Sequence, residues 1–319
     1  MSGSTRLVLA RVVEVTARRP GVATLACSIE GAGGGETVPA LAYTDVTGPV
    51  RAGDPVVLNT AALEAGLGTG GFAFVVAPAE CAGIEGGGGG SGGGGGVGIG
   101  SGGAGSGDGA AAPSFLVKAR YTPLQVLVSG VDEQTSPHHE ALREAGSVGG
   151  MPVVTADLHS ALPAIVAGAT ADGARPRIVY VMPDGGALPI AFSRTVAALR
   201  EAGLLAATVT AGQAYGGDFE AVGVHSALLA ARLVAGADLV IVAQGPGNLG
   251  TGTRWGFSGV AVGEWVNAAA ALGGRAVGAL RVSGADGRAR HRGLSHHSAT
   301  AYGAVALRPA DLAVPAWGD

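Results

Sequence analysis

The seven histidines of this chain lie between His138 and His297, and none occurs in the first 137 residues. His138-His139 form one pair, and His296-His297 form a second pair five residues after His291. Imidazole is the commonest metal ligand in proteins and the side chain best suited to proton transfer near neutral pH. We therefore expect the chemistry in the second part of the chain, with both pairs as candidate catalytic residues.

The spacing of the histidines fits no known metal motif. None of the separations in the last group is the i, i+3 or i, i+4 spacing that places two ligands on one helix face. In an extended chain, His296 and His297 point to opposite sides. Asp157 and His159 are two residues apart and could both reach one ion from a loop. A divalent metal ion stays open as a cofactor, beside the alternative that each histidine caps an element or lies on the surface.

Asp184 is a further catalytic candidate. It lies in the loop Pro183–Pro189, directly after an apolar stretch that predicts a buried strand. Ligands of open α/β sheets bind beyond the carboxyl ends of the strands, so an aspartate there could bind a metal or act as a base. The alternative is that Asp184 caps the next helix. Arg194 follows on that helix between Ser193 and Thr195, and it is a candidate for binding an anion.

The loop 244–259 follows the clearest buried strand, Asp238–Ala243, and is rich in glycine. Its G-x-G-x-x-G pattern resembles a dinucleotide fingerprint, but further glycines oppose the helix that such a motif must open, so a dinucleotide is not expected. The backbone and hydroxyl groups instead offer donors around a cation, which suits a phosphate or carboxylate. The candidate ligand-binding residues are Gly245, Gly247, Thr251, Thr253, Arg254 and Ser258. The alternative is an extended turn region with Trp255 and Phe257 packed inward.

The stretch Arg288–Ser298 holds three arginines and three histidines. Arg292 lies among them and could bind an anionic group. A solvated basic loop is the alternative interpretation of the same composition. His225, by contrast, stands alone in a predicted helix, where a histidine is more often structural than catalytic.

Two different patterns of apolar residues predict the elements that position these side chains. Residues 6–77 show short apolar runs between glycine- and proline-rich turns, which is typical of a small β-barrel or sandwich. After a glycine tract, continuous apolar strands alternate with helices, which predicts a mostly parallel sheet covered by helices on both faces. We therefore predict an α/β protein with a β-rich domain at 1–84, a flexible glycine-rich linker or insertion at 85–113, and an α/β domain at 114–319 that carries the site.

Composition argues against several classes of function. Lys118 is the only lysine, so a P-loop nucleotide site is impossible and pyridoxal phosphate is not expected. The two cysteines form no CxxC motif, and the net charge of -4 comes without a basic patch, so zinc–thiolate sites and nucleic-acid binding are not expected. The first apolar run is too short for a signal peptide and no stretch could span a bilayer, so we expect a cytoplasmic protein that binds no membrane. A homo-oligomer stays open.

Five segments of the chain resemble a family of bacterial proteins, chiefly actinobacterial and firmicute, that is known only as a domain of unknown function (DUF3866). These segments are Asn59-Thr60 with Gly66–Gly71, Arg120–Gln125, Asp184–Thr195, Gly245–Gly259 and His291–His297. The resemblance covers nearly everything outside the glycine tract, which it implies to be an insertion in this member. It brings no activity with it.

Together these residues predict an enzyme of the hydrolase or transferase type that acts on a small anionic molecule. Asp184 or a histidine of the two pairs would perform acid–base or metal chemistry, while Arg194, Arg254 or Arg292 would hold the anionic group. The alternative is a non-catalytic module that binds a small anion or a protein partner, with the β-rich domain as its docking part. Both alternatives stay open at this point.

Overall fold

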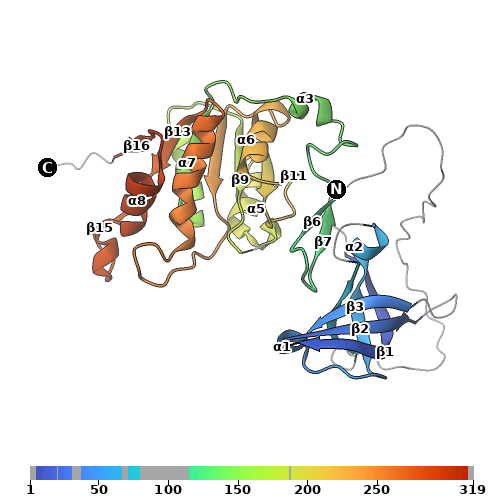
Figure 1. Cartoon of the computed structure of the whole chain (residues 1–319). Helices are drawn as coiled ribbons and strands as arrows, with labels where there is room; N and C mark the ends of the chain where they lie inside the picture. Colours follow the sequence, from blue (N-terminus) through green and yellow to red (C-terminus); the bar gives the residue numbers. More distant parts are fainter. Residues whose placement is uncertain are drawn as a thin grey trace. The chain divides into compact units, whose positions relative to one another are not determined.

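The computed structural model describes residues 5–19, 21–30, 37–66, 71–79, 115–186 and 188–314. The predicted glycine-rich linker at 85–113 lies outside these residues. The chain forms two compact units, both drawn in Figure 1. One unit holds the N-terminal strands together with residues 120–127, and the other holds the chain from Val128 onward together with residues 115–119.

The N-terminal unit contains a closed barrel of five strands in the order β1-β2-β3-β5-β4. Its elements are β1 (Leu7–Arg19), β2 (Val22–Ile29), β3 (Thr37–Tyr43), α1 (Thr44–Thr47), β4 (Pro55–Asn59), α2 (Ala61–Glu64) and β5 (Ala73–Pro78). Buried residues alternate with more exposed ones along β2 and β3, because one face of each strand lines the barrel core. The structure therefore confirms the barrel rather than the sandwich.

Strand β1 replaces two shorter strands that the sequence predicts at Leu7–Leu9 and Val12–Val15. Its pairing with β2 shifts in register between Val12 and Glu14, and again between Val15 and Ala17. Irregularities of this kind bend a long strand, which lets it follow the barrel wall. Arg11, which separates the two apolar runs, is an outward-facing residue of the same strand.

The second unit is built on a seven-stranded sheet in the order β11-β10-β9-β12-β8-β13-β16. All neighbouring strands run parallel. The strands are β8 (Pro152–Ala156), β9 (Ile178–Met182), β10 (Ala207–Ala211), β11 (Phe219–Ala221), β12 (Leu239–Ala243), β13 (Arg275–Ala279) and β16 (Asp311–Ala313). The predicted parallel α/β sheet is confirmed, and the carboxyl ends of β8, β9 and β12 meet at one edge.

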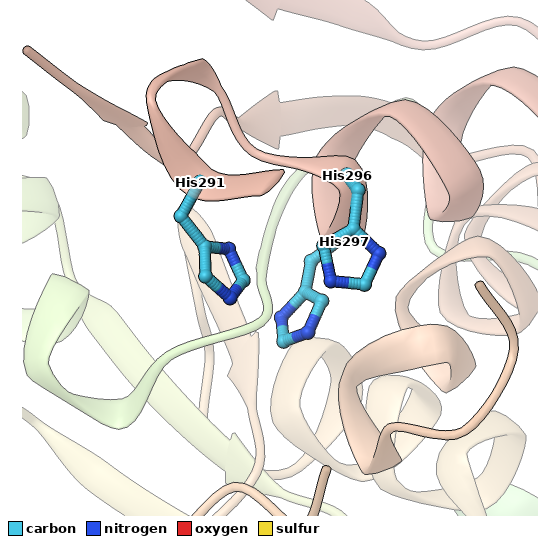
Figure 2. A group of neighbouring side chains, drawn as sticks. All are labelled: His291, His296 and His297. Carbon is cyan, nitrogen blue, oxygen red and sulfur yellow. The ribbon is translucent and has the colours of Figure 1, made fainter. Parts of the chain in front are cut away.

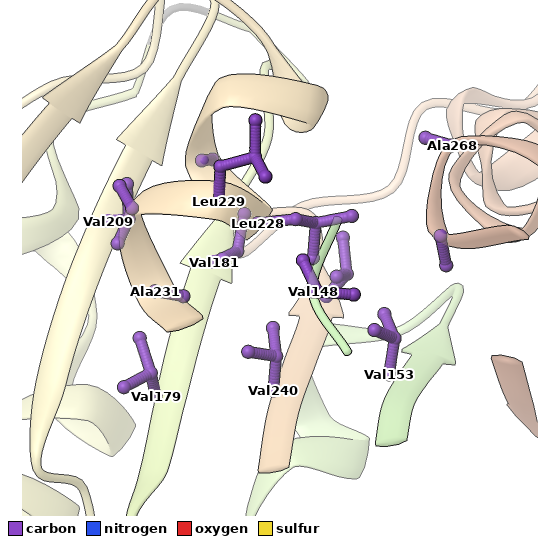
Figure 3. Packing of buried hydrophobic residues seen from close by; sticks show 14 of the residues in the cluster. Val148, Val153, Val179, Val181, Val209, Leu228, Leu229, Ala231, Val240 and Ala268 are labelled. Carbon is purple, nitrogen blue, oxygen red and sulfur yellow. The ribbon is translucent and has the colours of Figure 1, made fainter. Parts of the chain in front are cut away.

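Helices cover both faces of this sheet. They are α4 (Leu162–Ala169) and α5 (Arg194–Glu201) on one face, and α6 (Val224–Leu233) and α7 (Val262–Ala271) on the other. Val179 and Val181 of β9 belong to the core under α6 and α7, whereas Tyr180 between them belongs to the core under α4 and α5. Figure 3 shows the first of these cores, with Leu228 of α6 lying over the valines of the strands.

Smaller elements complete the two units. They are β6 (Leu116–Lys118), β7 (Val126–Val128), α3 (His139–Arg143), the antiparallel pair β14 (Val282–Ser283) and β15 (Gly293–Leu294), and α8 (His296–Thr300), which continues into a π-helical turn at Ala301–Val305. In the part of the chain that the structure describes, no helix has the length and apolarity needed to cross a membrane.

Helix α6 begins later than the sequence predicts. Aspartate is a preferred N-cap, so the sequence predicts a helix that begins at Asp218 and runs to about Ala235. In the structure, however, the next three residues form β11 and the helix starts at Val224. Asp218 instead accepts hydrogen bonds from the backbone N–H and the hydroxyl of Thr208, at 2.8 and 3.0 Å. The prediction was wrong because a strand of three residues depends on its pairing with β10, which the local sequence does not show.

Helix α5 also begins later than predicted. Phe192, Val196 and Leu199 follow the i, i+4, i+7 pattern of one helix face, so the sequence predicts a helix over about 188–202 with Phe192 on its buried face. The structure has a 3₁₀ turn at Ile190–Phe192, and Ser193 is the N-cap of a helix that starts at Arg194. Phe192 is 67% exposed. Ser193 therefore stands at a helix terminus and not inside a helix.

The only lysine, Lys118, is buried and holds the end of β10 against β11. Its ammonium group donates to the carbonyl oxygens of Gly212, Ala214 and Ala221 at 2.7, 3.2 and 2.9 Å, and it lies 3.4 Å from the carboxylate of Glu220. Burial lowers the pKa of Lys118, while the charge of Glu220 acts in the opposite direction. These contacts give Lys118 a structural role.

Candidate functional site

A pocket of about 280 Å³ lies at the carboxyl edge of the parallel sheet. Its walls come from the turn after β8, the first residues of α5 and the glycine-rich segment after β12. Open α/β sheets bind ligands at this edge. The lining residues are Leu158, His159, Ser160, Ser193, Arg194, Thr195, Gln244, Gly245, Pro246, Gly247 and Asn248.

Ser193 and His159 share a hydrogen bond in this pocket. His159 begins a 3₁₀ turn shortly after β8, and Ser193 caps α5. Their side-chain atoms, Nε2 of the histidine and Oγ of the serine, lie 2.6 Å apart. The serine oxygen also accepts the backbone N–H of Val196 at 3.0 Å, which fixes it at the helix terminus. A serine bonded to a histidine in this way has a base in place to activate its hydroxyl as a nucleophile.

The second ring nitrogen of His159 determines where the proton is. His159 Nδ1 lies 3.2 Å from the carbonyl oxygen of Gln244 and 3.1 Å from the hydroxyl of Tyr180. A carbonyl oxygen only accepts, so Nδ1 carries the proton and the lone pair of Nε2 faces Ser193. Burial lowers the pKa of His159. The imidazole is therefore neutral at neutral pH and can accept the serine proton.

The start of α5 offers donors for an anionic group beside this pair. The first N–H groups of a helix have no partner within it, and the helix dipole favours negative charge there. Arg194 and Thr195 supply the first two of these N–H groups, and both line the pocket. The side chain of Arg194 is exposed and adds a positive charge. The pocket thus brings together a serine hydroxyl, an imidazole hydrogen-bonded to it and the first N–H groups of a helix.

His291, His296 and His297 form a second group at the same edge of the sheet, which we call the histidine cluster. One ring nitrogen of each lies within 4.8 Å of a nitrogen of the other two. Figure 2 shows the three rings gathered together. His291 comes from the loop between β14 and β15, whereas the other two histidines open α8. His291 is 2% exposed and His297 is 7% exposed, so the cluster is largely buried.

Several contacts orient the rings of the histidine cluster. His297 Nδ1 lies 3.0 Å from a carboxylate oxygen of Asp157, so this nitrogen carries its proton toward the carboxylate. The ring of Phe257 stacks on His297 with 3.9 Å between the centroids and 2° between the planes. His291 Nδ1 lies 2.8 Å from the hydroxyl oxygen of Ser295. His296 Nε2 is buried and has no hydrogen-bond partner among the described residues.

Paired charges surround the cluster. Arg281 lies 4.0 Å from the carboxylate of Asp157 and 3.7 Å from that of Asp286. Asp286 also pairs with Arg288 at 2.9 Å. Burial, followed by the positive charges of Arg281 and Arg288, lowers the pKa of His291 to about 4. His291 is therefore neutral at neutral pH.

Asp157 connects the histidine cluster to the pocket. Its carboxylate holds His297, while its backbone oxygen accepts from the amides of Gln244 at 2.9 Å and Asn248 at 3.4 Å, both of which line the pocket. A Cβ on Gly259 would lie only 2.8 Å from the Cβ of Asp157. Glycine at that position therefore lets the loop after β12 approach Asp157 closely.

The structure does not bring the two predicted histidine pairs together. His296 and His297 lie in the histidine cluster. His138 packs edge-on against Phe219 at the start of β11, with 5.9 Å between the ring centroids. His139 Nδ1 lies 2.8 Å from a backbone carbonyl oxygen. Strand β11 is an edge strand, separated from β8 by β10, β9 and β12.

Asp184 lies at the carboxyl edge of the sheet but does not belong to the residues that line the pocket. Its carboxylate accepts the backbone N–H of Gly186 at 3.0 Å in the exposed turn after β9. A Cβ on Gly212 would lie 2.8 Å from the Cβ of Asp184. Asp184 therefore faces the end of β10.

The predicted anion-binding residues fall into two groups, of which the first lies at or near the pocket. Arg194, Gly245 and Gly247 line it. Ser258 donates to the side-chain oxygen of Asn248 at 2.8 Å and so orders a residue that does line it.

The second group lies in exposed segments. Thr251 and Thr253 share a hydrogen bond of 3.1 Å. The guanidinium of Arg254 lies 5.0 Å from the centre of the Trp255 ring. Arg292 is exposed just before β15. None of these four predicted residues, Thr251, Thr253, Arg254 and Arg292, lines the pocket formed by the described residues.

Sequence reasoning missed the pairing of Ser193 with His159. The two residues are 34 positions apart, His159 shortly after β8 and Ser193 in the segment between β9 and α5, so the pair becomes visible only when β8 and β9 are placed in one sheet. One local signal was available. A serine directly before the pattern of Val196 and Leu199 is a preferred N-cap, and placing the helix start there would have put Ser193 at the sheet edge.

Fold and site together define a protein of the open α/β class with a pocket at the carboxyl ends of its parallel strands. Residues 39–319 match the family model described as Protein of unknown function (DUF3866), and the chain belongs to this family. The matched range runs from within β3 to the end of the chain and so includes the whole parallel sheet. The predicted family resemblance is confirmed. No curated protein and no solved structure matched the chain.

Proposed function

We propose that the chain is a hydrolase or transferase that acts on small anionic molecules, with Ser193 as its nucleophile and His159 as its general base. The 2.6 Å hydrogen bond between these side chains, inside a pocket at the functional edge of the sheet, carries this proposal. The predicted reaction type is thereby retained, but it rests on residues other than Asp184 and the histidine pairs.

The reaction begins with the proton of the serine hydroxyl. As Ser193 Oγ attacks an acyl or phosphoryl group, its proton passes to the lone pair of His159 Nε2. The same proton then passes to the leaving group as the first bond breaks. In the second half of the reaction, water or another acceptor attacks the serine-bound group while its proton passes to His159 Nε2. The bond to Ser193 Oγ then breaks, and His159 returns this proton to the serine oxygen. Base catalysis of this kind contributes about 10²- to 10⁴-fold to a rate.

The surroundings of His159 set a limit on this chemistry. In serine–histidine–aspartate enzymes a carboxylate holds the ring and stabilises the imidazolium that forms. Here a carbonyl oxygen of Gln244 and the hydroxyl of Tyr180 face the corresponding nitrogen. Both orient the ring, but neither carries a full negative charge. We therefore expect a slower nucleophile than in a complete triad.

An anionic substrate is favoured by the helix terminus beside Ser193. Arg194 and Thr195, which supply the first N–H groups of α5, line the same pocket as Ser193. A carboxylate or phosphate bound there would place its neighbouring electrophilic atom near Ser193 Oγ. The same N–H groups could alternatively hold the oxyanion that develops during attack.

A non-catalytic anion-binding module is the competing function. The two functions differ in whether Ser193 acts only as a helix cap or also as a nucleophile. Capping explains the contact between Ser193 and the N–H of Val196, but it does not require His159 Nε2 at 2.6 Å. Asparagine caps helices about as well as serine but has no nucleophilic hydroxyl. Ser193→Asn therefore removes the nucleophile and keeps the cap.

Labelling with a fluorophosphonate, which reacts with activated serines, tests the proposal. We expect the probe on Ser193 of the wild type, no label there in Ser193→Asn, and labelling about 100-fold slower in His159→Gln. Ser160→Ala removes another serine that lines the pocket, and it should label like the wild type. A wild type that is not labelled at Ser193, but that binds phosphate as tightly as Ser193→Asn does, would favour the binding module instead.

A further inference from the structure

We propose that His291, His296 and His297 form a binding site for a divalent transition-metal ion, with zinc as the best fit, and that Asp157 positions His297 for it. The chemistry proposed for Ser193 does not involve this ion. The metal site therefore goes beyond the proposed function and can be tested separately from it.

The three histidines already approach the spacing of a metal site. One ring nitrogen of each lies within 4.8 Å of the others. Two nitrogen ligands of a tetrahedral zinc ion, with Zn–N distances of about 2.1 Å, are about 3.4 Å apart. Small rotations of the side chains close a difference of about 1.4 Å. The rings of His296 and His297, although adjacent in sequence, have centroids only 4.5 Å apart.

The partner of His297 is the one that metal-binding histidines usually have. Such histidines donate the N–H of the nitrogen not bound to metal to a carboxylate, a carbonyl or water, which fixes the tautomer and the ring orientation. His297 Nδ1 does this with Asp157, so its Nε2 keeps a free lone pair. The hydroxyl of Ser295 can accept from His291 Nδ1 in the same manner. The stacked ring of Phe257 further restricts His297.

His296 adds an independent observation. Its Nε2 is buried without a hydrogen-bond partner among the described residues. A polar atom in that state is unfavourable unless something satisfies it. A metal ion bound between the three rings would accept the lone pair of this nitrogen if Nδ1 carries the proton.

The donor atoms indicate which ion fits. Three imidazoles suit zinc, copper, nickel or iron, whereas magnesium and calcium prefer oxygen ligands. Three protein ligands also leave a fourth tetrahedral position for water or an anion. Two of the nearby positive charges are partly offset, because Arg281 is shared between Asp157 and Asp286 and because Arg288 pairs with Asp286.

Cobalt(II) is the probe for this site, because tetrahedral coordination by nitrogen gives it visible absorption bands. The protein is the full chain without an affinity tag, freed of metal with a chelator. We expect one equivalent of Co²⁺ per chain, displaced by Zn²⁺. Binding should be lost in His291→Ala, His296→Ala and His297→Ala. Asp157→Asn keeps the shape but removes the charge, and it should weaken binding by about 10- to 100-fold.

Two matched controls and one folding control make the result decisive. His138→Ala and His225→Ala remove histidines outside the cluster and should bind Co²⁺ like the wild type. His296 is only partly buried, so His296→Ala is the variant expected to fold best, and circular dichroism checks this. Absence of bands from natively folded wild type, or unchanged bands in folded His296→Ala, would overturn the metal site. Labelling of Ser193 in the presence of chelator reports on the proposed function alone.

Discussion

At the scale of single residues, the position of one proton decides what the pocket can do. The contact of His159 Nδ1 with the Gln244 carbonyl assigns the proton to that nitrogen, and Nε2 is left to accept from Ser193. The opposite tautomer would place an N–H against the serine oxygen and make the hydroxyl a poorer nucleophile. The carbonyl oxygen of Gln244 therefore fixes the tautomer of His159, and this tautomer leaves Nε2 to accept the proton of Ser193.

We predict that the rate of fluorophosphonate labelling at Ser193 falls with decreasing pH, with a midpoint below the ordinary histidine pKa of about 6.5. The base works only when neutral, and burial lowers the pKa of His159. Labelling rates measured from about pH 4.5 to pH 8 should therefore be flat near neutrality and decline only in the acid range. A midpoint at or above the ordinary value would contradict the assignment of His159 as the base.

The same lowered pKa has a consequence for stability. The unfolded chain holds a proton on His159 up to the ordinary pKa, whereas the folded chain releases it at lower pH. The unfolded state therefore binds more protons between the two values. The contribution of neutral His159 to stability is present above the unfolded pKa and is lost as the pH falls through the folded pKa.

Residue types alone indicated part of the site. His296 and His297 are recognisable as candidates because histidine is rare and chemically versatile. Asp157, the partner of His297, lies 140 positions earlier in the chain, so this contact depends on the packing of α8 near the end of β8. The inward packing considered for Trp255 and Phe257 holds for Phe257, which is 5% exposed, and not for Trp255, which is 54% exposed.

At the scale of elements, helix α8 and its π-helical continuation carry two of the three proposed metal ligands. The π-helical turn Ala301–Val305 packs against α7, and Gly263 of α7 makes the close approach possible. A Cβ on Gly263 would lie 2.5 Å from the carbonyl oxygen of Ala301 and 2.6 Å from the Cβ of Val305. The position of the histidine pair is therefore coupled to a helix contact outside the cluster.

We predict that Gly263→Ala destabilises the protein by roughly 1–3 kcal/mol, because the new methyl group must displace packed backbone. It should also weaken Co²⁺ binding, since the π-helical turn continues directly from α8. Urea denaturation and the cobalt titration measure the two effects. Gly303→Ala is the matched control: it lies in the π-helical turn with open space around its Cβ, so it should be neutral or slightly stabilising. Equal effects of the two substitutions would contradict the role of Gly263 in the packing of α7 against the π-helical turn.

The long apolar elements were predictable, and the short polar ones were not. Strands such as β9 and β12 are fully or almost fully buried and read as continuous apolar runs. Strand β11 consists of three residues, and its central Glu220 is buried beside Lys118, Thr210 and the N–H of Gly216. Besides its pairing with β10, this strand accepts a hydrogen bond from Lys118, about 100 positions away in the chain, and no local pattern shows either contact.

At the scale of the whole molecule, the pattern of apolar residues changes along the chain, and this change predicted two architectures. It did not predict the order of the strands. The sheet places β12 between β9 and β8, although β12 is the later strand in the sequence. Which strands become neighbours depends on the crossover connections and on the fit of the helix layers, and not on the strands themselves. The order nevertheless decides the site, because it brings the ends of β8, β9 and β12 together.

The two units have separate cores, and this separation gives the last prediction. Leu25 and Val56 belong to the barrel core, whereas Val179 and Leu228 belong to a core of the parallel sheet. A ligand stabilises the folded state that binds it, by about 2.7 kcal/mol at 100 times its Kd. We predict that Co²⁺ at this ratio raises the free energy of opening, measured by amide hydrogen exchange, in the strands of the sheet by up to this amount.

The barrel provides the internal control for that measurement. Amides of β2 and β3 exchange through opening of a core that contains none of the three histidines, so their exchange should not change when Co²⁺ is added. In His297→Ala the ion should protect neither unit, because the site has lost a ligand. Equal protection of barrel and sheet would mean that the ion acts on the chain without selecting the histidine cluster. Protection that persists in His297→Ala would place the ion elsewhere in the sheet unit.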